Sequence, residues 1–281
     1  LTIDAANGTG MIDGLGITAI DGSAADVVAA LNAMDVDPTN FNSLITGATA
    51  SVADLHTISL ATTGMVTATG VTSLDGTAAD VVTVINDAGI TTSTTFNSAL
   101  TGIASAADIA DIRAATTGLL DGSAITVLSG PLAADVAQAL TDLNTDPLAP
   151  FIWSEAVGDA LAVDLITISQ ATSSTLDASA VTAINGTVQK VSDVINDTGI
   201  LKPVIFNTTL TGPATAAQIL TIDAANGTGM IDGLGITAID GSAADVVAAL
   251  NAMDVDPTNF NSLITGATAS VADLHTISLA T

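Results

Sequence analysis

The stretch Ile17-Thr-Ala-Ile-Asp-Gly-Ser-Ala-Ala-Asp26 carries the local signals that decide the fold, and related stretches recur farther along the chain. In the recurrence that begins at Val71, the β-branched run Val71–Leu74 predicts a strand and Asp75-Gly76 predicts a turn. Thr77-Ala-Ala-Asp80 then predicts a helix start of the capping-box type. In such a box the Thr hydroxyl accepts from the N3 amide, and the acid at N3 returns a bond and meets the positive end of the helix dipole.

The helix expected after this cap follows from the spacing of its apolar residues. Apolar side chains stand at Ala78, Val81, Val82 and Ile85, which is the i, i+3, i+4, i+7 pattern of an amphipathic helix. Asn86–Gly89 predicts the end of the helix, with Gly89 in a left-handed conformation. Each copy of the phrase therefore predicts a strand, a turn and a helix, in that order.

A second coil of the same design follows the first. Phe96–Leu100 alternates as a strand does, Thr101-Gly102 predicts a turn, and Ser105-Ala-Ala-Asp108 predicts another capped helix. We therefore expect an α/β fold, an elongated repeat solenoid of about 55-residue units with two strand–turn–helix coils each. An all-β solenoid is the alternative, and the sequence leaves open whether the helices share one face. Further boxes of this form are predicted at Ser23–Asp26, Ser51–Asp54 and Thr215–Gln218.

The recurrences define the repeat units. Their starts at Ile17, Val71, Ile125, Val181 and Ile236 are 54, 54, 56 and 55 residues apart. The third unit diverges, with an insertion around residues 148–155 that contains the single tryptophan, Trp153. We assign residues 1–16 to the end of a preceding unit, 17–70 to unit 1, 71–124 to unit 2, 125–180 to unit 3, 181–235 to unit 4 and 236–281 to a partial unit.

A second, longer repeat is identical in sequence. Residues Leu1–Thr62 recur letter for letter as Leu220–Thr281, so the long period is 219 residues. We expect the chain to be a portion of a longer periodic polymer. We also expect the two identical copies to share one conformation apart from their ends.

The five phenylalanines of the chain keep the same period. One aromatic ring at one fixed place in each unit indicates packing, because each unit must fill the same space in a stack of coils. We therefore expect all five rings to be buried in equivalent places, and each is predicted to have a structural role. These residues are Phe41, Phe96, Phe151, Phe206 and Phe260.

Composition narrows the class of partner. The chain has 29 acidic and 3 basic residues, a formal net charge of −26, so nucleic acid is excluded as an expected partner. With 48% hydrophobic residues it is nevertheless apolar enough to fold. It has no cysteine, and no run of 18 apolar residues predicts membrane insertion.

No constellation of residues predicts an enzyme. His56 and His275 are one position in two copies, interpreted as a surface or rim histidine, and Glu155 is an isolated glutamate. Gly8-Thr-Gly10 lacks the lysine of a phosphate-binding loop and is interpreted as a turn. Most aspartates have structural places in caps and turns. The metal candidates are Asp13, Asp21, Asp35 and Asp37, with calcium as the only cofactor considered, although no EF-hand loop is present.

Three phrases carry a resemblance to a known group of proteins. They are Thr46-Gly-Ala-Thr-Ala-Ser-Val-Ala-Asp-Leu55, Ala115-Thr-Thr-Gly118 and Leu176-Asp-Ala-Ser-Ala-Val-Thr182. They resemble the giant Thr/Ala/Asp-rich repeat proteins on the cell surfaces of cyanobacteria and other aquatic bacteria, which are S-layer, adhesin or haemolysin-like products. The resemblance implies secretion without disulfides, an extracellular or cell-surface location and often calcium. The calcium-binding nonapeptides of that group are missing from this sequence.

Two functional hypotheses follow. The first is a structural segment of a periodic extracellular filament, sheath or surface layer, built by end-to-end stacking of repeats, with copies of itself as partners. The alternative is an adhesin stalk or a binding solenoid for a surface or a glycan. Ladders of threonine would favour the alternative, and Thr72, Thr126 and Thr182 do fall at equivalent places, although they are sparse.

Overall fold

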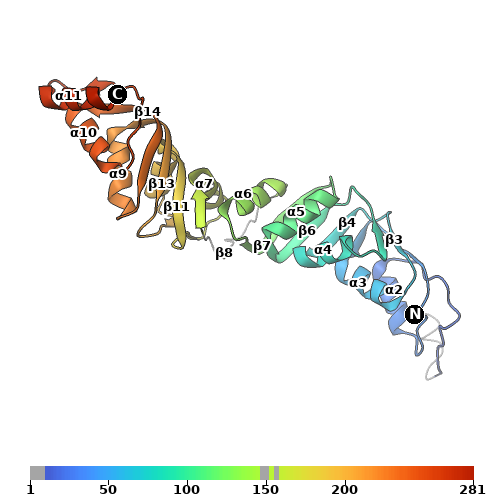
Figure 1. Cartoon of the computed structure of the whole chain (residues 1–281). Helices are drawn as coiled ribbons and strands as arrows, with labels where there is room; N and C mark the ends of the chain where they lie inside the picture. The colour runs from blue at the N-terminus through green and yellow to red at the C-terminus, as the bar shows by residue number, and fades with distance from the viewer. Residues whose placement is uncertain (1–9, 146–151, 155–157) are drawn as a thin grey trace. The chain divides into compact units, whose positions relative to one another are not determined.

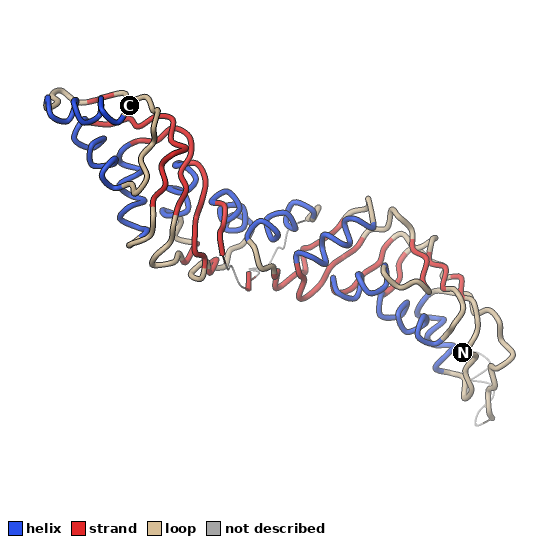
Figure 2. The backbone as a smooth tube through the Cα atoms, in the orientation of Figure 1, coloured by secondary structure: helices blue, strands red, loops and turns tan. Residues whose placement is uncertain are grey.

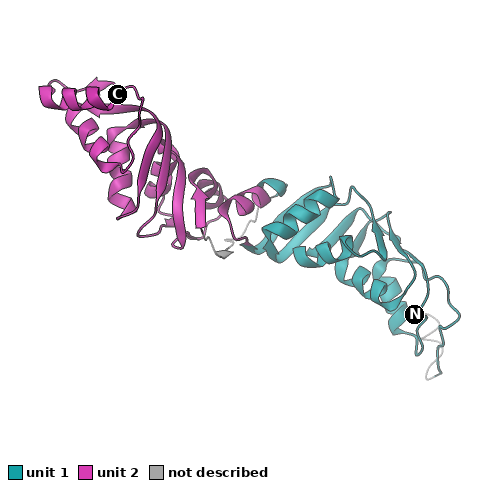
Figure 3. Cartoon of the chain, in the orientation of Figure 1, with its two compact units in different colours: residues 1–128, 141–149 teal, residues 129–140, 150–281 magenta. Residues whose placement is uncertain are grey.

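A computed structural model describes residues 10–145, 152–154 and 158–281 of the chain, and it divides the chain into two compact units (Figure 3). One unit comprises Leu1–Leu128 and Thr141–Ala149, and the other comprises Ser129–Leu140 and Pro150–Thr281. Phe151, Glu155 and most of the predicted insertion at residues 148–155 lie outside the described residues.

The first unit alternates short strands with helices (Figure 1). Its helices are α2 (Ala24–Asn32), α3 (Val52–Ala61), α4 (Ala78–Ile85) and α5 (Ala106–Ala115). Its strands are β1 (Ser43–Leu44), β2 (Thr49–Ser51), β3 (Val66–Ala68), β4 (Ser73–Thr77), β5 (Ile90–Thr92), β6 (Ser98–Ser105) and β7 (Leu120–Ser129). The strands form two rows, β1-β3-β5 and β2-β4-β6-β7, and the pairs with a defined register are parallel.

The second unit repeats this arrangement, and α6 (Ala133–Asp142) crosses the division between the units. Its other helices are α7 (Ala162–Ala171), α8 (Val188–Asn196), α9 (Ala216–Asn226), α10 (Ala243–Ala252) and α11 (Val271–Ala280). Its strands are β8 (Ile152–Ser154), β9 (Gly158–Leu161), β10 (Leu176–Asp177), β11 (Val181–Thr187), β12 (Ile200–Leu201), β13 (Thr208–Thr215), β14 (Ile231–Ser242) and β15 (Ile264–Thr265). The order β15-β14-β13-β11-β9 makes one parallel sheet, and β10 pairs with β12.

The ten helices among the described residues begin 26 to 29 residues apart. Consecutive helices contact each other from α2 to α5 in the first unit and from α7 to α11 in the second, and Figure 2 shows the helices of each unit along one face of its strands. The α/β class predicted from the sequence is confirmed, and the all-β alternative is wrong. The open question of helix placement is also answered, because consecutive helices share a face within each unit.

The helices begin at the predicted caps, but the aspartates act differently from the prediction. The Thr77 hydroxyl accepts from the Asp80 amide at 3.2 Å and donates to the Asp80 carboxylate at 2.7 Å. The Asp80 carboxylate therefore accepts from the Thr77 hydroxyl and not from the Thr77 backbone amide. Gln218, one methylene longer, does reach the backbone amide of Thr215 at 2.9 Å, which completes a true capping box.

One predicted box is absent. Ser51 stands at the N-cap of α3 without a side-chain bond to the helix. Ser51 is also the last residue of β2, where it pairs with Asp75 of β4.

The two predicted turns before the helices are wrong. Asp75-Gly76 lies inside β4 and Thr101-Gly102 lies inside β6, because Gly76 and Thr77 pair with Leu100 and Thr101 of the neighbouring strand. The chain bends without leaving the sheet, since Gly102 takes a left-handed φ of 70°. The same place in the other coils of this kind also holds a left-handed glycine, namely Gly47, Gly158, Gly212 and Gly266.

The predicted left-handed Gly89 is also wrong, because Gly89 is not among the glycines with a positive φ. Its amide donates to Asp87 Oδ1 at 2.8 Å, and a Cβ at this position would lie 3.1 Å from Ser59 Oγ of the preceding helix. Gly89 lies beyond the end of α4, which is capped by Asn86, and it has little space for a side chain.

Candidate functional site

The phenylalanine side chains are the largest groups in the core between strands and helices. Four of the five lie in described residues, and their exposed fractions are small. These are Phe41 at 1%, Phe96 at 0%, Phe206 at 1% and Phe260 at 4%. Phe151 lies outside the described residues. The four rings are equivalent by sequence position and are all buried, as a packing role requires.

The backbone of Phe41 and of Phe96 is held by the threonine at the end of the helix that follows it. Thr62 Oγ1 accepts from the Phe41 amide at 2.9 Å and donates to the Phe41 carbonyl at 2.6 Å. A Cβ on Gly64 would overlap that same carbonyl, so only glycine fits there. Thr116 repeats the bond to the Phe96 carbonyl at 2.6 Å. At these two places the end of a helix is tied back to the phenylalanine before the strand segment that leads into that helix, Phe41 or Phe96.

The asparagine that follows three of the phenylalanines joins one coil to the next. Asn42 Oδ1 accepts from the Met65 amide at 2.9 Å, 23 residues farther along the chain. Asn97 accepts from Leu119 at 2.8 Å and Asn207 accepts from Met230 at 2.9 Å in the same way. A side-chain carbonyl thus continues the strand-to-strand bonding at the same point of three coils. The sequence analysis missed this ladder, although the signal, Asn-Ser/Thr after every phenylalanine except Phe151, was visible.

In the coils that lie between those with a phenylalanine, a glycine lies against the first residue of the preceding helix. A Cβ on Gly76 would overlap Val52 Cγ2, and a Cβ on Gly241 would lie 3.0 Å from the Ala216 Cβ. Val52 and Ala216 are the first residues of α3 and α9. These Asp-Gly glycines, predicted to be turn residues, are therefore contact points where one coil lies against the next.

The aspartates proposed as metal ligands bind backbone amides. Asp35 accepts from Ile12 at 2.7 Å, Asp13 from Leu15 at 2.9 Å and Asp21 from Leu44 at 2.8 Å. Asp37 is exposed. Among the residues that the structure describes, no three acidic, histidine or cysteine side chains are grouped as a metal site would require. The structure therefore gives Asp21 and Asp35 places in the coil-to-coil bonding and Asp13 a place in a local turn, and it does not gather the four into one site.

Three aspartates have perturbed acidity, and each shift has a local cause. Desolvation raises the pKa of Asp164 and of Asp256. The hydroxyl and then the amide of Ser179 lower the pKa of Asp177 by binding its carboxylate at 2.6 and 3.0 Å. At the N-cap position before Asp164, Leu161 replaces the usual serine or threonine, so no N-cap hydroxyl can donate to this carboxylate.

The histidine position differs between its two copies. His56 is half-buried on α3, and its Nδ1 is enclosed without a hydrogen-bond partner. His275 of α11 is exposed. The prediction of a surface or rim histidine agrees with both positions, since His275 is exposed and His56 is half-buried.

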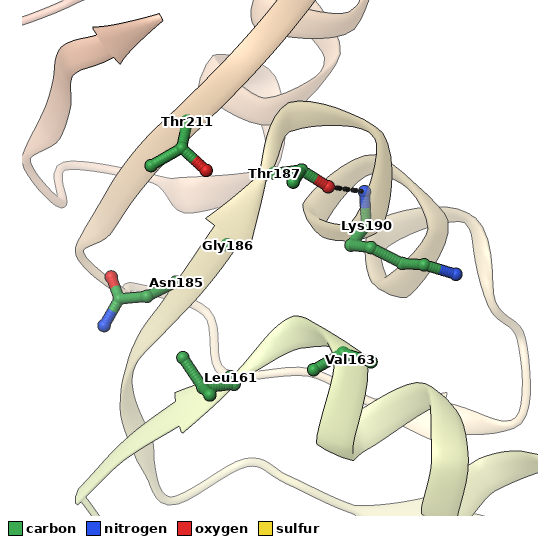
Figure 4. Close-up of a pocket in the computed structure, with 7 residues that line it drawn as sticks. All are labelled: Leu161, Val163, Asn185, Gly186, Thr187, Lys190 and Thr211. Atoms are coloured by element: carbon green, nitrogen blue, oxygen red, sulfur yellow. Dashed lines mark hydrogen bonds between the residues drawn. The ribbon is translucent and has the colours of Figure 1, made fainter.

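One open cavity lies in the second unit, with a volume of about 250 Å³ (Figure 4). Its walls include Leu161 and Val163 on one side and Lys190 on the other. The Lys190 ammonium points away from Leu161 in Figure 4 and lies 3.7 Å from the Asp193 carboxylate. The cavity is mainly apolar, and its lining has no acid–base pair or nucleophile–base pair.

Comparison with family models, with curated proteins and with solved structures gives no match for this chain. None of the helices in the described part of the chain is long and apolar enough to cross a membrane.

Proposed function

We propose that the chain is a segment of an elongated repeat solenoid with a mechanical and structural role outside the cell. Its units would be those defined from the sequence, and it would form part of a periodic filament, sheath or surface layer whose repeats stack end to end. The calcium inferred from the resemblance is not part of this proposal, because the candidate aspartates bind backbone amides.

One observation carries the proposal: the same contacts join one coil to the next at several points of the chain. The Asn–amide bond recurs at Asn42, Asn97 and Asn207, and a glycine receives the preceding helix at Gly76 and Gly241. Contacts of one kind that recur from coil to coil can extend a chain to any length, as a filament or surface-layer protein requires. The exact repeat of Leu1–Thr62 as Leu220–Thr281 supports the same interpretation.

The large negative charge supports a location in which the protein surface is in contact with water and ions. With 29 acidic residues against 3 basic ones, the surface repels nucleic acid and anionic lipid, and we expect neither as a partner. Such a charge keeps long polymers apart laterally unless cations screen it. Copies of the repeat itself are the expected partners.

The test is to treat intact cells with protease and to measure the native polypeptide under denaturing conditions. We expect a polypeptide far larger than the 27.5 kDa of this chain, lost from intact cells on treatment. Cells lysed before treatment serve as the control for protease access. A polypeptide protected in intact cells but cut after lysis would contradict the proposal. Saturable binding of the purified chain to surface glycans would favour the adhesin alternative instead.

A further inference from the structure

The cavity in the second unit has no part in the coil-to-coil contacts described above (Figure 4). Its volume of about 250 Å³ exceeds the roughly 150 Å³ of an apolar cavity that admits benzene. Leu161 and Val163 form its apolar wall, and they are 50% and 47% exposed. All of its lining residues lie between 161 and 211, inside the second unit and away from both ends of the sequence.

The repeat shows which of the lining side chains the fold itself does not need. Residues 51–101 and 215–265 form two other places with the same parallel strand register as residues 161–211. Both places have a hydroxyl residue, an alanine and two aspartates as the equivalents of Leu161, Val163, Asn185 and Lys190. These equivalents are Ser51, Ala53, Asp75 and Asp80 in one place and Thr215, Ala217, Asp240 and Asp245 in the other.

The four differences change the chemistry of this place in one direction. Two carboxylates are replaced by an amide and an ammonium, and two small side chains are replaced by branched apolar ones. Because the same fold is built twice without them, the apolar wall and the positive charge are not required for folding. An apolar wall beside a positive charge suits a ligand that has an apolar part and a negative charge.

The hydroxyl of Thr187, which also lines the cavity, lacks the acceptor that its counterparts have. The Thr77 hydroxyl donates to the Asp80 carboxylate at 2.7 Å, and the same bond is made at three further helix starts. Thr187 accepts from the Lys190 amide at 3.3 Å, but none of the residues that the structure describes accepts from its hydroxyl. The position that a carboxylate oxygen takes beside Thr77 is therefore open beside Thr187.

Lys190 supplies the positive charge and is held only loosely. Its ammonium points away from Leu161 in Figure 4 and lies 3.7 Å from the Asp193 carboxylate, with the two side chains 45% and 36% exposed. An ion pair so exposed to water contributes little to stability. Asp193 also accepts from Gln189 Nε2 at 2.7 Å, so it keeps a partner when the Lys190 side chain turns toward the cavity.

We infer that this cavity binds a small aliphatic carboxylate. The carboxylate of the ligand would accept from the Thr187 hydroxyl, in the position that Asp80 takes beside Thr77, and would pair with the Lys190 ammonium. Its alkyl chain would lie against Leu161 and Val163 and remove their apolar surface from water. Such a site is additional to the proposed structural role, and its test does not depend on that role.

The test is a titration of the 281-residue chain with hexanoate, followed by NMR of the leucine and valine methyl groups. An ionic strength of about 0.1 M screens exposed charges more than about 10 Å away, so that the net charge of −26 does not mask the local ammonium. We expect saturable shifts at Leu161 and Val163. Acetate, which lacks the alkyl chain, and hexylammonium, which has the opposite charge, should each bind about tenfold more weakly or worse.

A charge variant tests the carboxylate position. Lys190→Asp introduces the residue type of Asp80, which the fold already accepts at the start of α4, and its carboxylate would occupy the Thr187 hydroxyl. We expect hexanoate to bind about tenfold more weakly or worse. Lys202→Asp is the matched control, because it changes the net charge equally and Lys202 does not line the cavity. Circular dichroism checks that both variants keep their secondary structure.

A second variant tests the apolar wall separately from the charge. Leu161→Thr introduces the residue type of Thr215, which the fold accepts at the equivalent position. We expect hexanoate to bind several-fold more weakly and the affinity for acetate to stay the same, because only the alkyl chain contacts this wall.

Four outcomes overturn the inference. They are the absence of saturable shifts at Leu161 and Val163, hexylammonium binding as tightly as hexanoate, an unchanged hexanoate affinity in either cavity variant, and an equal loss in Lys202→Asp. None of these outcomes bears on the size or the protease access of the native polypeptide, which test the proposed function.

Discussion

Residues 10–62 and 229–281 are one sequence in two surroundings, and their local backbone is nearly the same. The N-cap Ser23 has φ −64° and ψ 153°, and its twin Ser242 has −65° and 152°. Gly47 and Gly266 both have φ 102°. The helices α3 and α11 begin and end at equivalent residues. Helices and left-handed glycines are therefore set by the sequence within a few residues, whereas the capping bond is made at Ser270 and not at its twin Ser51.

The same comparison shows what neighbours decide. In the second copy, residues Ile231–Ser242 form the continuous strand β14, which pairs with β13. In the first copy the equivalent residues make only isolated bridges, at Asp13, Ala19 and Gly22. The expectation of one shared conformation therefore holds for the helices and fails for this strand. A strand needs a partner on its edge, whereas a helix makes its bonds within itself.

The largest expected effect tests a place where the two copies agree. Phe41→Ala and Phe260→Ala should each lower the free energy of unfolding by roughly 3–5 kcal/mol, because both rings are buried in the core. Urea denaturation of the two single variants, followed by circular dichroism, measures both losses. A loss at Phe260 well below that at Phe41 would show that burial in the last coil is not equivalent to burial in the first.

The next effect tests a place where the copies differ. Leu55→Ala should lower the free energy of unfolding by about 2–5 kcal/mol, because Leu55 is fully buried between coils. Leu274→Ala should cost under about 1 kcal/mol, because this side chain is already partly in water. The same denaturation measurement, made at a protein concentration where the chain is monomeric, compares the pair. Equal losses would mean that packing against the next coil adds nothing to the stability that Leu55 provides.

The third pair concerns the glycine of the contact point. Gly241→Ala places its methyl group 3.0 Å from the Ala216 Cβ, and we expect a loss of about 1–3 kcal/mol from overpacking. Gly22→Ala should be neutral or slightly stabilising in the monomer, since its Cβ has room and alanine leaves the unfolded chain fewer conformations than glycine does. Thermal unfolding of the two variants distinguishes them. A destabilised Gly22→Ala monomer would contradict the view that only the neighbouring coil requires glycine here.

The smallest expected effect lies at a helix cap. Ser270 accepts from the Asp273 amide at 3.0 Å, so Ser270→Ala should cost about 1 kcal/mol. Its twin Ser51 makes no such bond, and Ser51→Ala should cost only a few tenths of that amount. Denaturation midpoints of the two variants measure the difference. If Ser51→Ala proved as costly as Ser270→Ala, Ser51 would have to cap its helix in solution.

Much of the fold could be predicted from the sequence because its signals are local. The cap at Thr77 and the apolar spacing from Ala78 to Ile85 define α4 without reference to any other coil. The period of the phenylalanines likewise marks the buried rings. The glycines were harder to interpret, because an Asp-Gly pair such as Asp75-Gly76 is a turn signal in isolation and a strand residue beside a neighbouring strand.

The candidate site was predicted less well. Asp21 and Asp35 were interpreted as metal candidates, but each accepts a backbone amide 23 residues away. The Asn42 ladder was not predicted at all, since its partner, the Met65 amide, is equally distant. No short-range pattern shows which amide an exposed asparagine or aspartate will meet.

The sequence by itself determined where the helices begin, which rings are buried and where the chain repeats, because torsional preferences and capping bonds act within a few residues. Only the tertiary structure decided which residues become continuous strand, which glycines are contact points, and that Val52 is buried while Val271 is exposed. Those properties depend on hydrogen bonds and on apolar burial between coils. A coil obtains both only from its neighbour.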